Sequence, residues 1–286
     1  MKYLFLAMRP YQWLKNIFIF LPVLFGRRLT DPSSLARTAL IFVSFCLVSS
    51  AVYLLNDIMD MDEDRGHPEK SKRPLVSGRI SVRESCLAAG VLLLLGLPIS
   101  FALGLYPGIT VSVYLMLNMA YTAALKNVVI IDVFCVGAFY YLRVLAGGAA
   151  NGIELSGWIV ICTVLLALFL AFNKRRHDLG LAKDHKSVPA KYNARFLDRM
   201  IGIISASVII SYALYAMDAG TIEKFGTNHL IFTVPFVFYG IFRYLYLVDV
   251  KNAGGDPSRV LIYDSKMQIN IILWIVVCVA VVYFKI

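Results

Sequence analysis

The sequence predicts an all-α protein that crosses a lipid bilayer many times. Of its 286 residues, 59% are hydrophobic and 16% are charged, whereas a soluble domain usually carries about 25% charged residues. The mean hydropathy of +0.72 is far above that of a globular protein. Apolar runs of about 18 to 22 residues recur along nearly the whole length, enough for a helix to cross a hydrocarbon core of roughly 30 Å. We therefore expect a single integral membrane domain over residues 1–286.

Nine apolar segments are candidate membrane-spanning helices. Arg9 and Pro10 precede the first segment, and no small-residue cleavage site follows it, so we expect a span rather than a cleavable signal peptide. Polar segments separate the later ones. The expected spans are residues 12–28, 38–58, 84–104, 108–125, 128–149, 156–173, 197–217, 229–247 and 267–285.

The distribution of basic residues predicts the orientation of these helices. With the N-terminus inside, most of the 28 Lys and Arg fall in or next to the inside segments, which are 1–11, 59–83, 126–127, 174–196 and 248–266. The positive-inside rule then places these segments on the cytoplasmic side of the cell (inner) membrane. This asymmetry also accounts for much of the net charge of +10, so we do not expect nucleic-acid binding. We expect the chemistry on the cytoplasmic face, where the long polar loops lie.

An acidic stretch, NDIMDMDED at residues 56–64, ends the second span. If the helix continues, Asp57, Asp60 and Asp64 lie within about 60° of one another, Asn56 flanks them, and Asp62 lies opposite. Three neighbouring carboxylates repel one another, so the pattern indicates a bound cation, and hard oxygen ligands suit Mg²⁺. The alternative is a solvated, charged helix end.

Basic residues form two further groups near expected helix ends. Each group either anchors the chain to anionic lipid head groups or binds phosphates beside a metal site. The groups are Lys70, Lys72, Arg73 and Arg79, after the acidic stretch, and Lys174, Arg175 and Arg176, which precede Asp178 at the end of the sixth span.

Ionisable and polar residues also occur within or beside the spans. Asp132 and Arg143 are eleven residues apart in the fifth span, so they lie on nearly one helix face but too far apart to touch. Ionised groups at such depth are costly and usually face a polar cavity. Arg143 is a candidate phosphate ligand, and the alternative is a structural pair with a carboxylate of another span. Lys15 and Asn16, near the start of the first span, are candidates for the same polar region.

The motif N56-D-I-M-D60-M-D-E-D64 resembles the first aspartate motif of the UbiA superfamily of intramembrane prenyltransferases. The resemblance covers essentially the whole chain. It implies a nine-helix bundle with a central cavity, an active-site mouth on the cytoplasmic side, and Mg²⁺ bridging aspartates and a diphosphate.

The chain departs from the usual second motif, D-x-x-x-D after the sixth span, because NKRRHD stands there at residues 173–178. This pattern is more similar to the branch that transfers phosphoribosyl groups to decaprenyl phosphate. The segments that carry this similarity are R9-P-Y-Q-W-L-K-N16, H67-P, K72-R-P74, L142-R-V-L-A-G-G148 and K174-R175.

The branch resemblance implies transfer of 5-phosphoribosyl from phosphoribosyl diphosphate (PRPP) to a polyprenyl phosphate, for cell-envelope glycan precursors. Diphosphate is released. The same arrangement of Mg²⁺ and aspartates suits PRPP or a prenyl diphosphate as the donor, since both ionise at a carbon by losing diphosphate. The implied catalytic residues are Asp57, Asp60 and Asp64, which with Asn56 form the metal set. The implied substrate ligands are Lys15, Asn16, Asn56, Lys72, Arg73, Tyr121, Lys126, Arg143, Lys174, Arg175 and Asp178.

Two other functions stay open at this point. One is transfer of a prenyl group from a prenyl diphosphate to an aromatic or other small acceptor. The other is a lipid carrier without catalysis, which would tolerate loss of the aspartates. The sequence also leaves open whether the chain forms a homo-oligomer.

Overall fold

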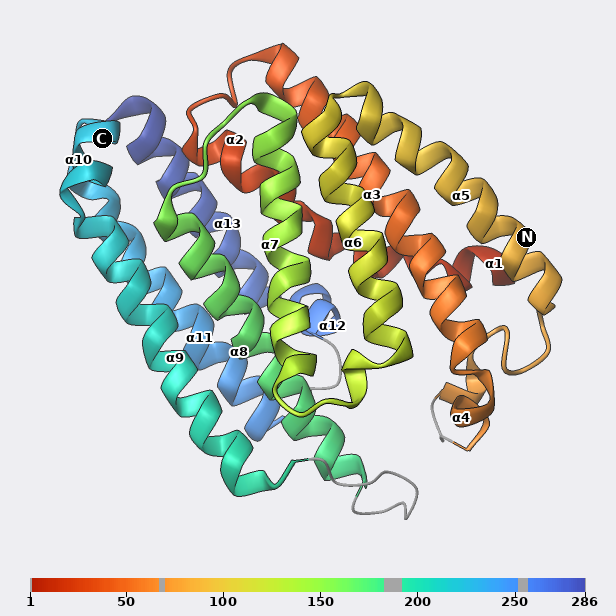
Figure 1. The fold of residues 1–286 in the computed structure, drawn as a ribbon. Helices are drawn as coiled ribbons and strands as arrows, with labels where there is room; N and C mark the ends of the chain where they lie inside the picture. Colours follow the sequence, from red (N-terminus) through yellow and green to blue (C-terminus); the bar gives the residue numbers. More distant parts are fainter. Residues whose placement is uncertain (1, 67–69, 183–191, 252–256, 286) are drawn as a thin grey trace. The chain divides into compact units, whose positions relative to one another are not determined.

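The computed structural model describes residues 2–66, 70–182, 192–251 and 257–285, and these ranges contain helices and no β-strand (Figure 1). The all-α expectation is therefore confirmed for the described residues. The chain divides into two compact units, Met1–Glu154 and Leu155–Ile286. The expectation of a single integral membrane domain stays a prediction.

Unit 1 contains the acidic stretch and the helices that surround it. Its elements are α1 (Lys2–Ala7), η1 (Pro10–Phe20), α2 (Leu21–Phe25), α3 (Pro32–Met59), α4 (Met61–Arg65), η2 (Lys70–Lys72), α5 (Val82–Ala102), α6 (Leu105–Ala123), η3 (Leu125–Asn127) and α7 (Ile131–Asn151).

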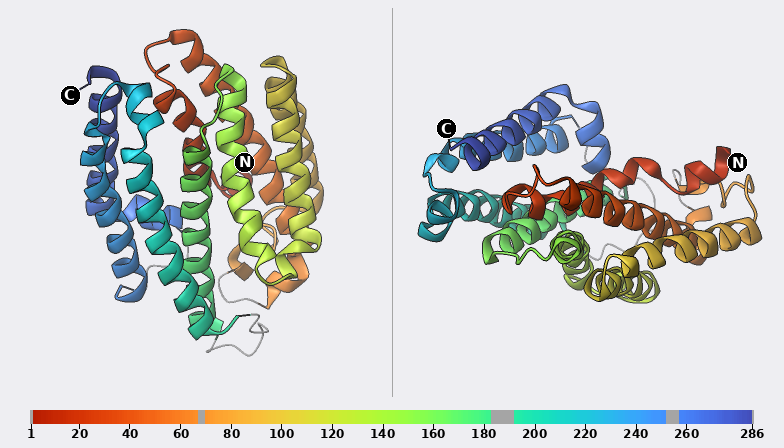
Figure 2. Two further views of the ribbon diagram at one scale, coloured as in Figure 1. Left: turned by 60° about the vertical axis from the view of Figure 1, so that its left-hand side comes forward. Right: turned by 90° about the horizontal axis from the view of Figure 1, so that it is seen from above.

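The 28-residue helix α3 is the centre of unit 1. It begins at Pro32, a residue suited to a first helical turn, and Asp31 caps it by accepting a hydrogen bond from Ser33 N at 3.1 Å. It packs against α5, α6, α7 and η1, and Figures 1 and 2 show it alongside α5 and α6. Phe45 and Val48 of α3 share a buried cluster with Tyr114 of α6 and Leu142 of α7. These contacts hold the middle of α3 against α6 and α7.

The first expected span, residues 12–28, is not one continuous α-helix. Its first part is the 3₁₀-helix η1, and its second part is the five-residue α2, which ends at Gly26. Pro22 has no N–H to donate to an earlier carbonyl, so an α-helix cannot pass through it with all its hydrogen bonds. With rises of about 2.0 and 1.5 Å per residue, the two parts still extend for about 30 Å.

Unit 2 contains the last expected spans. Its elements are α8 (Gly157–Ala182), α9 (Ala194–Met217), α10 (Ala219–Phe225), η4 (His229–Thr233), α11 (Val234–Asp249), α12 (Pro257–Tyr263), α13 (Ser265–Val279) and the short π-helix η5 (Ala280–Phe284). Within this unit α8 packs on α9, and α11 packs on both α9 and α13.

Seven helices in the described part of the chain are long and apolar enough to cross a membrane. Two of the nine expected spans are not among them. Residues 12–28 lack a long helix, and the 19-residue α6 has a lower hydropathy because it carries Tyr, Thr and Asn side chains, including Asn118 and Thr122. The multi-pass character is thus established, while the nine-helix arrangement stays a prediction.

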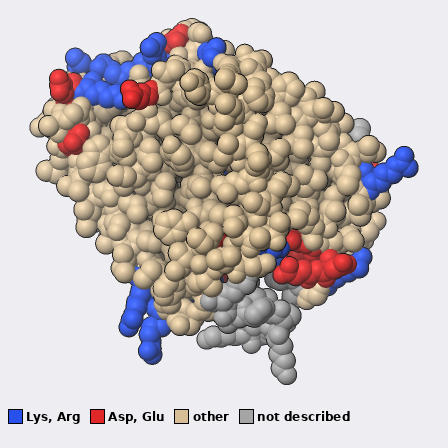
Figure 3. Space-filling model, in the orientation of Figure 1, with Lys and Arg blue, Asp and Glu red and all other residues tan. Residues whose placement is uncertain are grey.

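Large apolar side chains on the outer faces of the helices agree with a lipid environment. On α5, Leu87, Val91 and Leu94 are 62%, 55% and 75% exposed and recur at helical spacing. Water would penalise such a stripe, whereas hydrocarbon would not. The middle of the face drawn in Figure 3 is mostly uncharged, and acidic and basic side chains gather toward its edges.

Candidate active site

The acidic stretch lies where α3 ends and α4 begins. The helical path continues through this junction, because Asp60 N donates to Asn56 O at 2.9 Å and Asp64 N donates to Asp60 O at 2.8 Å. Asp57 and Asp64 are buried, at 1% and 0% exposure. The side chain of Asp62 is 86% exposed and pairs with Arg65. The expected helical stripe of Asp57, Asp60 and Asp64, with Asp62 off it, is therefore present.

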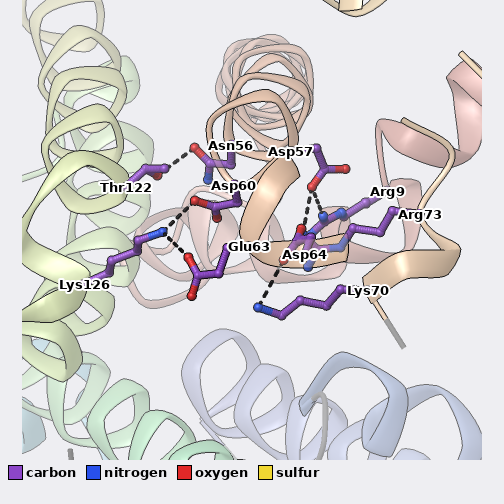
Figure 4. Close-up of polar contacts among 10 residues, drawn as sticks. All are labelled: Arg9, Asn56, Asp57, Asp60, Glu63, Asp64, Lys70, Arg73, Thr122 and Lys126. Carbon is purple, nitrogen blue, oxygen red and sulfur yellow. Dashed lines mark hydrogen bonds and ion pairs between the residues drawn. The ribbon is translucent and has the colours of Figure 1, made fainter. Parts of the chain in front are cut away.

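Arg73 joins the two buried aspartates (Figure 4). Its guanidinium donates to Asp57 Oδ1 at 3.1 Å and also to Asp64 Oδ2. Arg9 donates to the same Asp57 oxygen, and the ammonium of Lys70 lies 3.3 Å from Asp64 Oδ1. Charge-assisted contacts of this kind are stronger than neutral hydrogen bonds. Two buried carboxylates are thus held between three bases.

Asp60 and Asn56 are turned toward α6 and the loop that follows it. Lys126 of η3 donates to Asp60 Oδ1 at 2.5 Å and lies 3.6 Å from Glu63, while Thr122 donates to Asn56 Oδ1 at 2.7 Å (Figure 4). Burial would lower the pKa of Lys126, but its hydrogen bond to Asp60 and the nearby acidic charges outweigh this effect, so its pKa is raised above 10.5. Lys126 is therefore a cation at physiological pH.

The oxygen atoms of Asn56, Asp57, Asp60 and Asp64 suit Mg²⁺, which prefers carboxylate and amide oxygens as ligands. Asp57 Oδ2 and Asp64 Oδ1 are buried and accept no hydrogen bond. Buried oxygens without hydrogen-bond donors are unusual in proteins. A metal cation would satisfy Asp57 Oδ2, and at Asp64 Oδ1 it would take the place of the Lys70 ammonium, which lies 3.3 Å away. The described residues nevertheless contain no group of three or more His, Cys, Asp or Glu side chains placed to hold a metal ion together. Since Mg²⁺ usually also takes phosphate oxygens, the expected metal set stays a prediction.

Two local features place the bases beside the acids. Leu75 and Ile80, which follow Arg73 in the chain, are buried against Leu54 of α3 and anchor this loop to it. Arg9 has a left-handed backbone (φ 54°, ψ 59°), unusual for a residue other than glycine. Its guanidinium lies 5.0 Å from the ring centre of Tyr53, one helical turn before Asp57. The strained backbone thus belongs to a residue that pairs with a buried aspartate.

Arg143 and Asn16 form a separate interior group. Arg143 is 3% exposed and donates to Asn16 Oδ1, Tyr114 Oη and Phe139 O at 2.8, 2.9 and 2.8 Å. These three acceptors are neutral, and both roles considered for Arg143 stay predictions. The amide of Asn16 also contacts Cys46 Sγ at 3.3 Å. Cys46 precedes Asp57 by eleven residues on α3, which corresponds to about 16 Å along the helix.

The other expected ligands occupy several places. Tyr121 packs edge-on against Phe139 at 5.6 Å, Lys15 lies on η1, and Lys72 is exposed on η2. In unit 2, Lys174, Arg175 and Asp178 lie on α8, and Arg175 is 3.7 Å from Asp178. The His67-Pro68 motif lies outside the described residues. The roles expected for these residues stay predictions.

Sequence reasoning did not name Thr122, which contacts Asn56 directly. It named Lys70 only as a possible phosphate ligand or lipid anchor, and Arg9 only within the R9–N16 segment, without foreseeing their ion pairs with Asp64 and Asp57. Arg9 could have been found from the R9-P dipeptide at the start of the first span. Asp264, in the last expected inside segment, pairs with Arg243 at 2.7 Å and caps α13.

Comparisons with known proteins agree with this geometry. The model of the UbiA prenyltransferase family matches residues 18–283. The chain is 33% identical to a decaprenyl-phosphate phosphoribosyltransferase of Corynebacterium glutamicum, over 97% of this chain and 86% of that protein. It is 30% identical to the protein of the same name from Mycolicibacterium smegmatis, over 98% of this chain and 92% of that protein.

Solved structures show the same fold. A UbiA homologue from Archaeoglobus fulgidus, bound to GPP and Mg²⁺, superposes with a TM-score of 0.75 and 24% identity, over 99% of both chains. A digeranylgeranylglyceryl phosphate synthase superposes with a TM-score of 0.65 and 20% identity over the full length of both chains. The resemblance noted in the aspartate motif is thus confirmed over the whole sequence. The chain is a membrane-embedded transferase that belongs to the UbiA prenyltransferase family.

Proposed function

We propose that this chain transfers the 5-phosphoribosyl group of PRPP to a polyprenyl phosphate in a Mg²⁺-dependent reaction. The products are polyprenyl-phosphoryl-5-phosphoribose, a precursor for cell-envelope glycans, and diphosphate. We also propose that nine helical segments enclose a central cavity whose mouth faces the cytoplasm.

One observation carries the choice of donor. The relatives that match nearly the whole chain at 30–33% identity are named as phosphoribosyltransferases of decaprenyl phosphate. The NKRRHD segment agrees with this choice, because it offers bases where a second aspartate motif would offer carboxylates. PRPP carries a 5-phosphate that a prenyl diphosphate lacks, and additional bases suit that phosphate.

The acidic group would hold the metal and the leaving diphosphate. Asn56, Asp57, Asp60 and Asp64 would be the Mg²⁺ ligands from the chain, and the bound ion would act as a Lewis acid on the departing diphosphate. Arg73 and Lys126, which contact these aspartates, would bind phosphate oxygens and neutralise the charge that develops on them.

The acceptor side needs little proton transfer. A polyprenyl phosphate is already an anion, so its oxygen can attack the ribosyl carbon without a strong general base. We assign Lys15, Lys72, Lys174 and Arg175 to the acceptor phosphate and the ribose 5-phosphate. Tyr121 and Asp178 are candidates for positioning the ribose, and Asn16 and Arg143 for a deeper polar contact.

A comparison of donors tests the proposed reaction. The purified chain in lipid nanodiscs would receive either PRPP with a polyprenyl phosphate or a prenyl diphosphate with an aromatic acid, each with Mg²⁺. We expect diphosphate release and a phosphoribosyl lipid, identified by mass spectrometry, in the first mixture alone. Release only in the second mixture would replace the proposal with prenyl transfer.

Aspartate variants separate an enzyme from a lipid carrier. We expect Asp57→Asn and Asp60→Asn to lower turnover by at least about 100-fold, since each removes a charged ligand from the leaving-group site. The matched control is Asp62→Asn, because Asp62 lies on the same stretch but is exposed and pairs with Arg65. Near-normal function of Asp57→Asn would favour a carrier.

A further inference from the structure

The acids and bases of the candidate site balance one another in number. Four acidic side chains contact four basic ones, so the formal charge of the group is zero. The acids are Asp57, Asp60, Glu63 and Asp64, and the bases are Arg9, Lys70, Arg73 and Lys126 (Figure 4). Asp57 and Asp64 are almost fully buried, and Arg73 has a side chain that is only 25% exposed.

This balance penalises either ligand when it binds alone. Mg²⁺ by itself would add two positive charges and would meet the guanidiniums of Arg9 and Arg73 on Asp57. Diphosphate by itself would add several negative charges beside the same carboxylates. Net charge in a poorly solvated site is expensive, whereas the two ligands together nearly cancel.

The buried oxygens show where the cation would bind. Asp57 Oδ2 and Asp64 Oδ1 accept no hydrogen bond, while the other oxygen of each carboxylate faces Arg73. The Lys70 ammonium lies 3.3 Å from Asp64 Oδ1, so a metal ion at this oxygen would also compete with Lys70. A cation that binds the first pair of oxygens weakens the attraction of these carboxylates for the guanidinium. The guanidinium then needs another anion, and an arginine fork matches a phosphate with two parallel donors.

We propose that Mg²⁺ and diphosphate bind this site jointly, by an exchange of ion-pair partners. In this exchange Mg²⁺ takes Asp57 and Asp64, and Arg73 and Arg9 move from these carboxylates to oxygens of the diphosphate. Arg9 would then bind the diphosphate directly. The inference rests on the proposed function only in assuming a donor that carries a diphosphate.

Metal binding without turnover tests the exchange. Mn²⁺ would replace Mg²⁺ as the paramagnetic probe, and methylenediphosphonate would serve as an analogue that cannot be hydrolysed. Titration of the full chain in nanodiscs, followed by the EPR signal of free Mn²⁺ and corrected with protein-free titrations, gives both affinities. We expect the analogue to tighten Mn²⁺ binding on the order of tenfold or more, a typical coupling between linked sites.

Arg73→Gln should strengthen the binding of Mn²⁺ alone and weaken the effect of the analogue on Mn²⁺ binding. Without a competing guanidinium, Asp57 and Asp64 should bind Mn²⁺ alone on the order of tenfold more tightly, while the tightening caused by the analogue should largely disappear. Arg9→Gln should act in the same direction through Asp57 alone. Arg73→Lys, which keeps a charge but loses the fork, should fall between Gln and the native residue.

Arg65→Gln is the matched control, because it removes the same charge from an exposed pair on the same stretch. It should leave both affinities unchanged. Thermal unfolding in detergent identifies any variant that fails to fold. If Arg73→Gln fails, the Mn²⁺ affinities of Arg73→Lys are used in its place. Unchanged or weaker Mn²⁺ binding by folded Arg73 variants would overturn the exchange. Because both candidate donors contain the diphosphate, a wrong choice of donor would affect the turnover assay and not this one.

Discussion

Arg143 is a buried cation whose hydrogen-bond acceptors are all neutral. Its guanidinium joins Asn16 of η1 to Tyr114 of α6, and the ring centre of Tyr114 lies 4.8 Å from its carbon Cζ. The eleven-residue spacing from Asp132 predicted the depth of Arg143 and its need for other partners. It could not predict the partners, because they come from segments far away in the sequence.

The contacts of Arg143 predict a structural cost when it is removed. Arg143→Met should lower the free energy of unfolding by about 1–3 kcal/mol, the cost of leaving Asn16 Oδ1 buried without a donor. Equilibrium unfolding in mixed micelles measures this change. Arg83→Met is the control, since Arg83 is exposed on α5. Unchanged stability with lost binding of the diphosphate analogue would instead assign Arg143 to the substrate.

Helical periodicity determined which acidic side chains share a face, and this part of the site could be predicted. Asp57, Asp60 and Asp64 do lie on one helical path, and Asp62 is solvated. The sequence did not show that Asp60 turns to Lys126 while Asp57 and Asp64 share Arg73. Such a choice depends on which loops pack beside α3, and that is a tertiary property.

At the scale of elements, the contact of η1 with α7 depends on a glycine. A Cβ atom built on Gly147 would lie 2.1 Å from the carbonyl oxygen of Ile19, closer than any real contact. Small residues such as Gly147 let two backbones approach this closely. The close contact holds Asn16, three residues before Ile19, against Arg143.

Gly147→Ala should therefore destabilise the protein by about 1–3 kcal/mol, as an overpacked core does. Thermal unfolding in detergent gives the measurement, and Gly90→Ala on α5 is the control because its Cβ would meet nothing within 4 Å. The control should be neutral or stabilise slightly, since alanine favours a helix. Equal melting temperatures for the two variants would show that η1 can move away from α7 at no cost.

The start of α13 depends on Asp264, which caps Met267 N at 2.8 Å and pairs with Arg243. The hydrogen bond from Arg243 lowers the pKa of Asp264 below 3.8. A carboxyl group whose pKa is lower in the folded than in the unfolded state stabilises the folded state at pH values above its unfolded pKa. This stabilisation is lost as the pH falls through the pKa of the folded state. Asp264 therefore contributes at neutral pH and stops contributing only in strong acid.

We expect Asp264→Ala to cost more stability than Asp31→Ala, because Arg243 donates two hydrogen bonds to Asp264, whereas Asp31 accepts from Ser33 N and Ser34 Oγ. The loss at Asp31 should be about 1 kcal/mol, the usual value of a helix cap. The excess at Asp264, measured by unfolding at several pH values, should shrink below about pH 4 as the carboxylate is protonated. An excess that does not depend on pH would exclude the ion pair as its source.

At the scale of the whole molecule, the distribution of bases predicts a topology that accessibility can test. Single cysteines would be placed at Ser71 on η2 and at Lys251 after α11. Both should react with a membrane-impermeant maleimide from the cytoplasmic side only. Cysteines at Gly104 and Gly226 should react from the other side. The native cysteines would first be replaced by serine or alanine. Reaction of Ser71→Cys and Gly104→Cys from the same side would contradict the proposed orientation.

The sequence by itself determined the helical, membrane-embedded class, because the length and hydropathy of its segments are local properties that the bilayer selects. It also determined the spacing of the aspartates, which lie close together in the chain, and the family, because each motif of the family can be read within a short stretch of sequence. Only the tertiary structure decided the partners, such as Arg9 for Asp57 and Lys126 for Asp60, which lie 48 and 66 residues away. Charges of one sign attract any charge of the other sign, so their pairing depends on which helices and loops pack together.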